Sequence, residues 1–383
     1  MALATADLLA TFDQSTTEKL DLSDVLAAIL LTDTFLMGAI STGAPATQTT
    51  HTWPEAQLNA TTVTQLAGET ALTGSATSLV VASAQGLRVR IGALLRDIAA
   101  DKEELIQVTD IATDTLTIVR GFGATSGETH AAAAEFLIVG MPVQEGDTGV
   151  TDRARARTKG TNYTQIFKRE VIISGSTEAV EQAGVPDEFR YQMEQRMLEL
   201  QRELGIAIWN SYSAASVGSD TVYRSMSGVK ELITASGGNT NTTAESLSES
   251  VVNTMYKAAW DDGGNPTAIW GARQQIGQFA TFDQDKIRVA PSDRSRGKFV
   301  SKFLTDLGAE IDVRTDRWIG RSEVGMLDMS RISLHPLKGR AFFMEPLSKT
   351  GDARRAQILG EYTLEVRNAT LAHAVHTGLT VPS

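Results

Sequence analysis

The sequence predicts an α+β protein assembled from several distinct parts. Three observations predict this class: short alternating strand patterns between residues 70 and 143, one long amphipathic helix pattern over 186–212, and mixed helix and strand patterns from 225 onward. The chain has 383 residues, of which 42% are apolar and 21% are charged. That composition is typical of globular proteins and supplies enough apolar side chains for a sizeable core.

The composition excludes several functional classes. The chain contains no cysteine, which excludes disulfide bridges, cysteine-ligated zinc, iron–sulfur clusters and thiol nucleophiles. Its longest wholly apolar run, Val25 to Leu31, is seven residues long, whereas a membrane helix needs about 20. We therefore expect no membrane partner. The net charge of −11 argues against a dedicated nucleic-acid binder, which normally carries a basic surface.

The two halves of the chain differ in charge. Residues 1–150 contain 18 acidic and 6 basic side chains, whereas residues 151–383 contain 28 acidic and 29 basic ones. This asymmetry predicts either separate modules or complementary faces between copies of one chain.

The first 60 residues are typical of an arm and not of a compact domain. Ala2 to Phe12 has apolar residues at helical spacing, and a second apolar run from Asp21 to Leu31 begins with acidic residues that favour a helix start. The polar stretch Ala46 to Thr52 follows. Such a segment has little to pack against within itself, so we expect it to lie over another surface.

The block between residues 70 and 143 has the pattern of short strands. Leu87 to Ile91 alternates apolar and basic residues with period two, and Leu105 to Ile111 and Thr115 to Val119 are further strand candidates. The turn-forming pair Thr113-Asp114 separates the last two, and 136–139 ends the block. Strands this short at about 10-residue spacing predict a small β-barrel or sandwich.

A run of four basic residues, Arg153, Arg155, Arg157 and Lys159, alternates with alanine and threonine. This spacing would place the charges on one side of a strand. The run lacks the aromatic platform of a single-strand nucleic-acid binder. We favour a solvated edge or a charged contact with another protein, and an extended segment from Tyr163 to Ile173 follows.

The long helix is predicted from Pro186-Asp187-Glu188, where proline and acidic residues suit a first turn. Apolar residues then recur every three or four positions, which predicts one buried stripe along about six turns. The stripe consists of Phe189, Met193, Met197, Leu200, Leu204 and Ile208.

Residues 225–345 show a mixed α/β pattern. Ser246 and Glu249 fit a capping box that opens a helix, and Asp262-Gly263-Gly264 ends it. Thr267 to Trp270 is typical of a buried strand, and a helix carrying Ile276 and Phe279 follows. Strands are expected again at 341–344 and 361–366.

A search for catalytic or ligand-binding motifs finds no convergent set. His373 and His376 have helical i, i+3 spacing, but no carboxylate accompanies them at ligand-like spacing. Gly121 to Gly127 misses the dinucleotide-binding pattern by one residue and follows no βαβ unit. The chain also lacks a G-K-[ST] phosphate loop, a G-x-S-x-G elbow and an H-E-x-x-H motif. We therefore expect no enzymatic activity, no catalytic residue, no metal site and no cofactor.

Motifs spread in order along the chain resemble the major capsid proteins of tailed bacteriophages with the Hong Kong 97 fold. The segments that carry the resemblance are Asp21–Val25, Thr32–Leu36, His51–Trp53, Tyr163–Ala179, the helix Pro186–Tyr212, Leu347–Asp352, Gly360–Asn368 and Ala372–His373. The block at 70–143 departs from shorter members of the family. It resembles small β-modules of phage structural proteins and looks like a domain inserted in the extended loop.

The resemblance implies a domain plan. Residues 1–52 would be the N-terminal arm, and 53–175 the extended loop with a β-rich insertion domain at about 68–143. Residues 176–224 and 346–383 would form the peripheral domain, whose spine helix is 186–212. Residues 225–345 would form the axial domain.

The implied function is structural: copies of the chain form hexamers and pentamers that close into an icosahedral virion shell, assembled in the host cytoplasm. The shell would enclose double-stranded DNA without sequence-specific binding, and its partners would be scaffolding, portal and decoration proteins. The basic run would contact a neighbouring subunit. Two alternatives remain: an encapsulin-like nanocompartment shell, and a β-rich phage decoration or adhesion protein.

Overall fold

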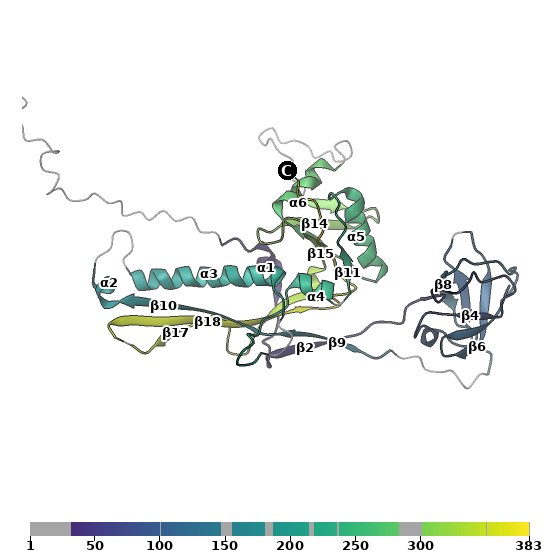
Figure 1. The fold of residues 1–383 in the computed structure, drawn as a ribbon, viewed down its shortest axis with the longest axis horizontal. Coiled ribbons are helices and arrows are strands. Elements are labelled where there is room, and N and C mark those ends of the chain that lie inside the picture. The colour runs from purple at the N-terminus through teal and green to yellow at the C-terminus, as the bar shows by residue number, and fades with distance from the viewer. Residues whose placement is uncertain are drawn as a thin grey trace, which may run out of the picture. The chain divides into compact units, whose positions relative to one another are not determined.

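The computed structural model describes residues 32–99, 101–146, 155–180, 187–213, 218–235, 237–282, 301–349 and 351–382. They form a mixed α+β fold, as the sequence predicts (Figure 1). The chain divides into two compact units. We call Pro54–Thr158 the barrel unit, and Met1–Trp53 together with Lys159–Ser383 the main unit. The helices predicted at Ala2–Phe12 and Asp21–Leu31 lie outside the described residues.

A five-stranded sheet in the main unit is built around one long strand, β18. In sheet order the strands are β1 (Ser41–Thr42), β16 (Ile332–Pro336), β18 (Ala353–Val366) and β10 (Gln165–Ser174), and β17 (Phe343–Leu347) also pairs with β18. β10 runs antiparallel to β18 along its whole length, while β17 and then β16 occupy the opposite edge of β18. The 14-residue β18 extends well beyond the six residues predicted at 361–366, because its first half lacks clear alternation.

The helix α3 (Glu188–Asn210) covers one face of this sheet, against β10 and β18 (Figure 1). Its amino terminus is capped by Asp187, whose carboxylate accepts a hydrogen bond from the Arg190 N–H at 3.0 Å. The 23 residues span about 35 Å. Five members of the predicted stripe are buried, namely Phe189, Met193, Leu200, Leu204 and Ile208, and Met197 is half-buried against the same core. The short helices α1 (Phe35–Ala39), α2 (Gly175–Ala179) and α4 (Val229–Ala235) complete this region.

A second, six-stranded sheet lies in the main unit. Its order is β11 (Asn239–Asn241), β19 (Ala374–His376), β15 (Val324–Leu327), β12 (Ala268–Gly271), β14 (Glu310–Thr315) and β13 (Lys302–Leu304). The helices α5 (Glu249–Asp261) and α6 (Arg273–Gln278), with the 3₁₀ turn η4 (Phe279–Thr281), share its core. A further 3₁₀ turn, η5 (Met329–Arg331), precedes β16. β2 (Thr50–Glu55) and β9 (Thr158–Tyr163) form a separate two-stranded sheet.

One local prediction in the main unit is wrong. The cap of α5 is Ser248, whose hydroxyl accepts from the Val251 N–H, whereas Ser246 contacts the hydroxyl of Thr380 at 3.0 Å. The helix therefore begins later than the predicted capping box. His373 and His376 lie at and beside β19, so they do not share a helix face. None of the helices in the described part of the chain is long and apolar enough to cross a membrane.

The barrel unit is a six-stranded sheet that closes on itself. Its order is β3 (Thr62–Thr64), β8 (Glu135–Gly140), β5 (Leu94–Asp97), β6 (Leu105–Ala112), β7 (Thr115–Val119) and β4 (Ser78–Val80). A bridge between Gln65 and Val81 joins the two outer strands. Inward-facing residues such as Ile106, Leu116 and Phe136 are fully buried. The strand spacing predicts either a small β-barrel or a sandwich, and the structure is the barrel.

The predicted strand at Leu87–Ile91 is wrong. This stretch begins with a 3₁₀ turn, η3 (Gly86–Arg88), and only Val89 of its three apolar residues is buried. The Asp114 carboxylate accepts hydrogen bonds from the backbone N–H groups of Ala84 and Gly86, both at 3.0 Å. These bonds hold the chain in a tight turn. The residues with alternating polarity therefore pair with no neighbouring strand.

Candidate assembly surfaces

The five-stranded sheet leaves apolar side chains uncovered on the face opposite α3. β10 buries Phe167 and Val171 beneath the helix, while Ile166 and Ile172 on its other face are 49% and 57% exposed. The register of β10, β18 and β17 places further half-buried apolar residues on that side. We call this set the outer face, and its members are Ile166, Ile172, Phe343, Leu347 and Leu359.

Polar pairs cross the outer face and fix its strands in register. Arg355 of β18 donates to the Glu170 carboxylate of β10, with Nε at 2.8 Å, and Gln357 donates to Glu345 of β17 at 2.8 Å. An apolar surface interrupted by satisfied polar groups is typical of protein–protein interfaces. The sequence does carry a signal for it, because β10 has apolar residues at both odd and even positions, as strands covered on both faces do.

The basic run does not form the predicted strand ladder. Arg153 lies outside the described residues, and Arg155 and Arg157 precede β9, which begins at Thr158. Of the three described basic residues, only Lys159 is in a strand. Arg155 donates from Nη1 to the Leu58 carbonyl oxygen at 3.1 Å within the barrel unit, and the three described basic residues are exposed. Their charges are therefore available to a partner, but not at strand spacing.

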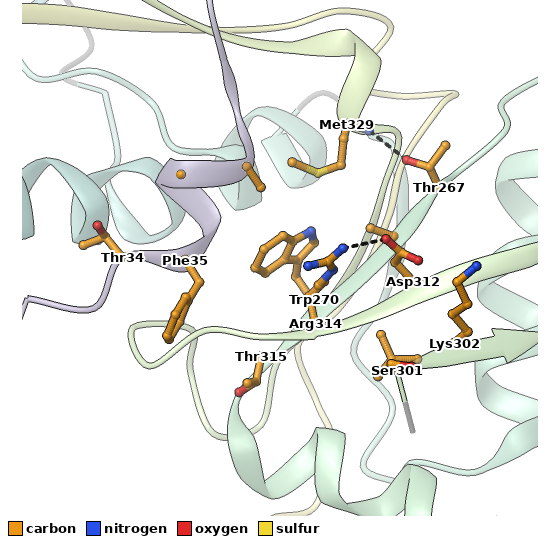
Figure 2. Close-up of a pocket in the computed structure, with 14 residues that line it drawn as sticks. Thr34, Phe35, Thr267, Trp270, Ser301, Lys302, Asp312, Arg314, Thr315 and Met329 are labelled. Carbon is orange, nitrogen blue, oxygen red and sulfur yellow. Dashed lines mark hydrogen bonds and ion pairs between the residues drawn. The ribbon is translucent and has the colours of Figure 1, made fainter. Parts of the chain in front are cut away.

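A groove of about 950 Å³ lies in the main unit between α1 and the β12–β14 part of the second sheet (Figure 2). Phe35 and Met329 flank it, and the Trp270 ring lies within it. Across the groove from Phe35, Asp312 and Arg314 form an ion pair at 2.8 Å. Among the described residues, the buried Trp270 Nε1 has no hydrogen-bond partner. The groove therefore combines apolar walls with an unsatisfied donor.

The barrel unit holds a buried charged cluster at one end. The Glu104 carboxylate accepts hydrogen bonds from Arg120 Nε and from the backbone N–H groups of Gly121 and Glu128, each at 2.8 Å. His130 lies between two carboxylates, with Nε2 3.0 Å from Glu104 and Nδ1 2.7 Å from Asp97.

These contacts determine the protonation of Glu104. Burial by itself raises the pKa of this carboxyl, but the hydrogen bonds from Arg120, from the two backbone N–H groups and from His130 outweigh it and lower the pKa from 4.5 to about 2. The glycine-bearing loop from Gly121 thus surrounds an internal carboxylate and not a phosphate. The cluster is fully paired and acts as a structural core.

The two histidines near the carboxy terminus have structural contacts. His373 accepts a hydrogen bond at Nδ1 from the Asp328 N–H at 3.1 Å, and burial lowers its pKa from 6.5 to about 4. His376 Nε2 lies 3.0 Å from the Glu245 carboxylate. Neither residue belongs to a set of three metal-ligand side chains among the described residues.

The model of the SU10 major capsid protein family matches residues 8–380 of the chain. The chain belongs to this family. As an SU10-type major capsid protein, it is a structural component of a phage virion shell and not an enzyme. This confirms the function predicted from the sequence. A search of curated protein sequences finds no match.

Solved structures of phage proteins are similar to this SU10-type chain. A structure from Microbacterium phage Oxtober96 aligns with a TM-score of 0.51 at 12% identity, covering 97% of this chain and 99% of that chain. The capsid asymmetric unit of cyanophage A-1(L) aligns with a TM-score of 0.52 at 10% identity, covering 97% and 100%. The holo-SrpI encapsulin complex from Synechococcus elongatus aligns over 59% of this chain with a TM-score of 0.42. The first two similarities are evidence of a shared fold.

Proposed function

We propose that the chain is a capsid subunit of the Hong Kong 97 type. In this proposal hexamers and pentamers close into an icosahedral shell around the double-stranded DNA genome of a tailed phage. The proposal is supported by the combination of a long helix on a sheet of long strands with a second mixed sheet, and by the family membership. Scaffolding, portal and decoration proteins are the proposed further partners.

The proposed domain plan keeps the boundaries that the resemblance implies. Residues 1–52 are the arm, 53–175 the extended loop with the insertion at about 68–143, and 225–345 the axial domain. The peripheral domain combines 176–224 with 346–383, and its spine helix is 186–212. The separate core of the barrel unit favours the inserted domain, and the position of α3 favours the spine helix.

The outer face is the observation that carries the proposal. Apolar surface removed from water contributes roughly 25 cal/mol per Å². A monomer leaves Ile166 and Ile172 about half exposed on long strands, without a covering layer in the described chain. A neighbouring subunit placed over this face would bury them, and repetition of that contact would build a shell.

We also propose that the basic run contacts the acidic surface of a neighbouring copy. Residues 1–150 carry 12 more acidic than basic side chains, and Arg155, Arg157 and Lys159 are exposed. Each exposed pair contributes only about 0–1 kcal/mol, but such pairs steer association and select register. Arg153 completes the proposed set.

The first experiment tests assembly by the full chain. The protein, alone or co-expressed with a scaffolding protein, should sediment as capsomers or particles visible by electron microscopy. Particles from infected cells should protect double-stranded DNA from nuclease. A species that stays monomeric in every condition would contradict the proposal, and particles that hold protein cargo without DNA would favour the nanocompartment alternative.

The second experiment isolates the charge contact. Changing Arg153, Arg155 and Arg157 together to glutamate should leave the melting temperature of the subunit unchanged and lower the shell yield. The matched variant with three lysines retains the charge and should assemble normally. Raising the salt concentration should reproduce the defect in the parent chain, since exposed charges are screened beyond about 8 Å at physiological ionic strength. Normal shell yield from the glutamate variant would contradict the proposed contact between subunits.

A further inference from the structure

Two histidines and one glutamate converge within the main unit, near the carboxy-terminal end of β18. His51 comes from β2, His335 from β16 and Glu365 from β18. One potential ligand atom from each lies within 4.8 Å of the other two, and no other set of this kind exists among the described residues. His335 and Glu365 are buried, whereas the His51 side chain is 19% exposed. The cluster is therefore enclosed but reachable from solvent at His51.

The hydrogen bonds fix which nitrogen of His335 carries a proton. Nδ1 lies 2.7 Å from the Ala44 carbonyl oxygen, which can only accept, so Nδ1 donates. In the neutral ring Nε2 then carries a lone pair, and this atom lies 2.8 Å from Ser333 Oγ and 3.2 Å from Glu365 Oε2. The same Glu365 oxygen lies 2.8 Å from Nε2 of His51. Two imidazole nitrogens thus face one carboxylate oxygen, an arrangement that positive charge between them would stabilise.

We propose that His51, His335 and Glu365 bind a divalent zinc ion. Two imidazoles and one carboxylate are a ligand set that zinc prefers, with the fourth position open to water. Tetrahedral bonds of about 2.0–2.1 Å put neighbouring ligand atoms about 3.3 Å apart. The two imidazole nitrogens lie 2.8 and 3.2 Å from Glu365 Oε2, within about 0.5 Å of that value, and the third pair of ligand atoms lies within 4.8 Å.

The surrounding residues orient the proposed ligands. The bond from His335 Nδ1 to Ala44 is the usual contact that directs a metal-binding imidazole and fixes its tautomer. A Cβ added at Gly43 would overlap the His335 ring, so the backbone there holds the ring in place. Arg367 donates from Nε to Oε1 of Glu365, which leaves Oε2 for the ion. Because the Arg367 side chain is 57% exposed, solvent screens its repulsion of a cation.

The proposed ion has a structural role. His51 is separated from Glu365 by 314 positions in the sequence. A shared ion would join β2 to the five-stranded sheet, and binding only to the folded chain would stabilise it by mass action. The ion therefore acts within a single subunit, and the site does not depend on how shells assemble.

The test uses the full chain without a polyhistidine tag, stripped with a chelator and then equilibrated with zinc. We expect about one zinc ion per chain by mass spectrometry after desalting, and a higher melting temperature than in the stripped protein. Replacing zinc with cobalt(II) should give the intense visible absorption of tetrahedral coordination, and added zinc should remove it. His51→Gln should weaken zinc binding at least tenfold.

His51→Gln is the informative variant because a glutamine side chain can still donate to Glu365, so the metal-free protein should fold as the parent does. Thr52→Ala, an exposed position on the same strand, is the matched control and should retain full binding. Zinc retention below about one-tenth of an ion per chain, or equal retention by His51→Gln and the parent, would overturn the proposal. Cobalt(II) that remains in octahedral, water-like coordination would do the same.

Discussion

The barrel unit and the main unit differ in how the strands of their sheets are covered. The barrel unit closes its six strands through the Gln65–Val81 bridge and buries a fully paired charged cluster around Glu104. The main unit lays α3 over one face of its five-stranded sheet and leaves Ile166 and Ile172 exposed on the other. Closing the barrel removes its free strand edges, although Val119 and Val139 on its strands stay about half exposed. The five-stranded sheet of the main unit has a face without a covering layer in the described chain, and we propose that neighbours cover it.

The aromatic residues allow the two units to be followed separately. All five tryptophans and all six tyrosines belong to the main unit, and residues 54–158 contain neither. Tryptophan fluorescence therefore reports only on the main unit. Hydrogen exchange of amides in β6 reports on the barrel unit, since this strand is bonded on both sides.

The largest expected effect comes from the core beneath α3. Leu200 is fully buried at the middle of the stripe, so Leu200→Ala should lower the unfolding free energy of the main unit by about 2–5 kcal/mol. Leu200→Asp should prevent soluble folding. Denaturant titration followed by tryptophan fluorescence measures the first change, and exchange in β6 should stay as in the parent.

Arg190→Ala is the control on the same helix. Arg190 is 79% exposed and pairs with Glu194 at 3.1 Å, an i, i+4 contact that contributes about 0.3–0.5 kcal/mol. Equal tolerance of Leu200→Ala and Arg190→Ala would mean that the stripe does not carry the core. Faster exchange in β6 on changing Leu200 would show that the two units do not unfold independently.

The stabilities of the two units should depend on pH in different ranges. His373 has a folded pKa of about 4 against 6.5 when unperturbed, so the unfolded chain binds more protons between these values. Its contribution to main-unit stability, about 3 kcal/mol, is complete above pH 6.5 and is lost as the pH falls toward 4. Glu104 has a folded pKa of about 2 against 4.5, so its similar contribution to the barrel unit is lost only between pH 4.5 and 2.

Acidification should therefore destabilise the main unit first. Between pH 6.5 and 4.5 the denaturation midpoint by tryptophan fluorescence should fall, while protection of the β6 amides should hold until below pH 4.5. His373→Asn, which retains an acceptor for the Asp328 N–H, should flatten the first dependence, and Glu104→Gln should flatten the second. Simultaneous loss of both units at one pH would contradict the assignment of these two groups.

Periodicity allowed the elements with a regular pattern to be predicted. The stripe from Phe189 to Ile208 and the hairpin around Thr113-Asp114 follow from spacing alone, because a helix face and a two-residue turn are local features. The turn at Leu87–Ile91 was not predictable in this way. Its conformation depends on Asp114, a carboxylate more than 20 residues away, which accepts hydrogen bonds from the backbone N–H groups of Ala84 and Gly86 just before this stretch.

The candidate sites depend on contacts that no spacing rule contains. His51 and Glu365 meet only because β2 lies near β18, while the histidine pair with suggestive spacing, His373 and His376, lies at and beside a strand. The basic run has the spacing of a strand, but its described residues Arg155 and Arg157 precede β9 and lie outside any strand. In each case tertiary pairing decides the outcome, and only the resemblance to capsid proteins supplied the function.

The smallest expected effect on subunit stability belongs to the outer face, and it tests the comparison most directly. Val171 and Ile172 are adjacent on β10 and face opposite sides of the sheet: Val171 is 5% exposed beneath α3, and Ile172 is 57% exposed. Threonine is β-branched and suits a strand at either position. Val171→Thr buries a hydroxyl and should cost about 1–3 kcal/mol. Ile172→Thr should change the stability of the isolated subunit by less than about 0.5 kcal/mol.

If neighbours cover the outer face, Ile172→Thr should nevertheless lower the yield of sedimenting particles, because the hydroxyl would be buried in every contact of the shell. Unchanged particle yield with Ile172→Thr would mean that this face stays in solvent, and the main unit would then be as self-sufficient as the barrel unit.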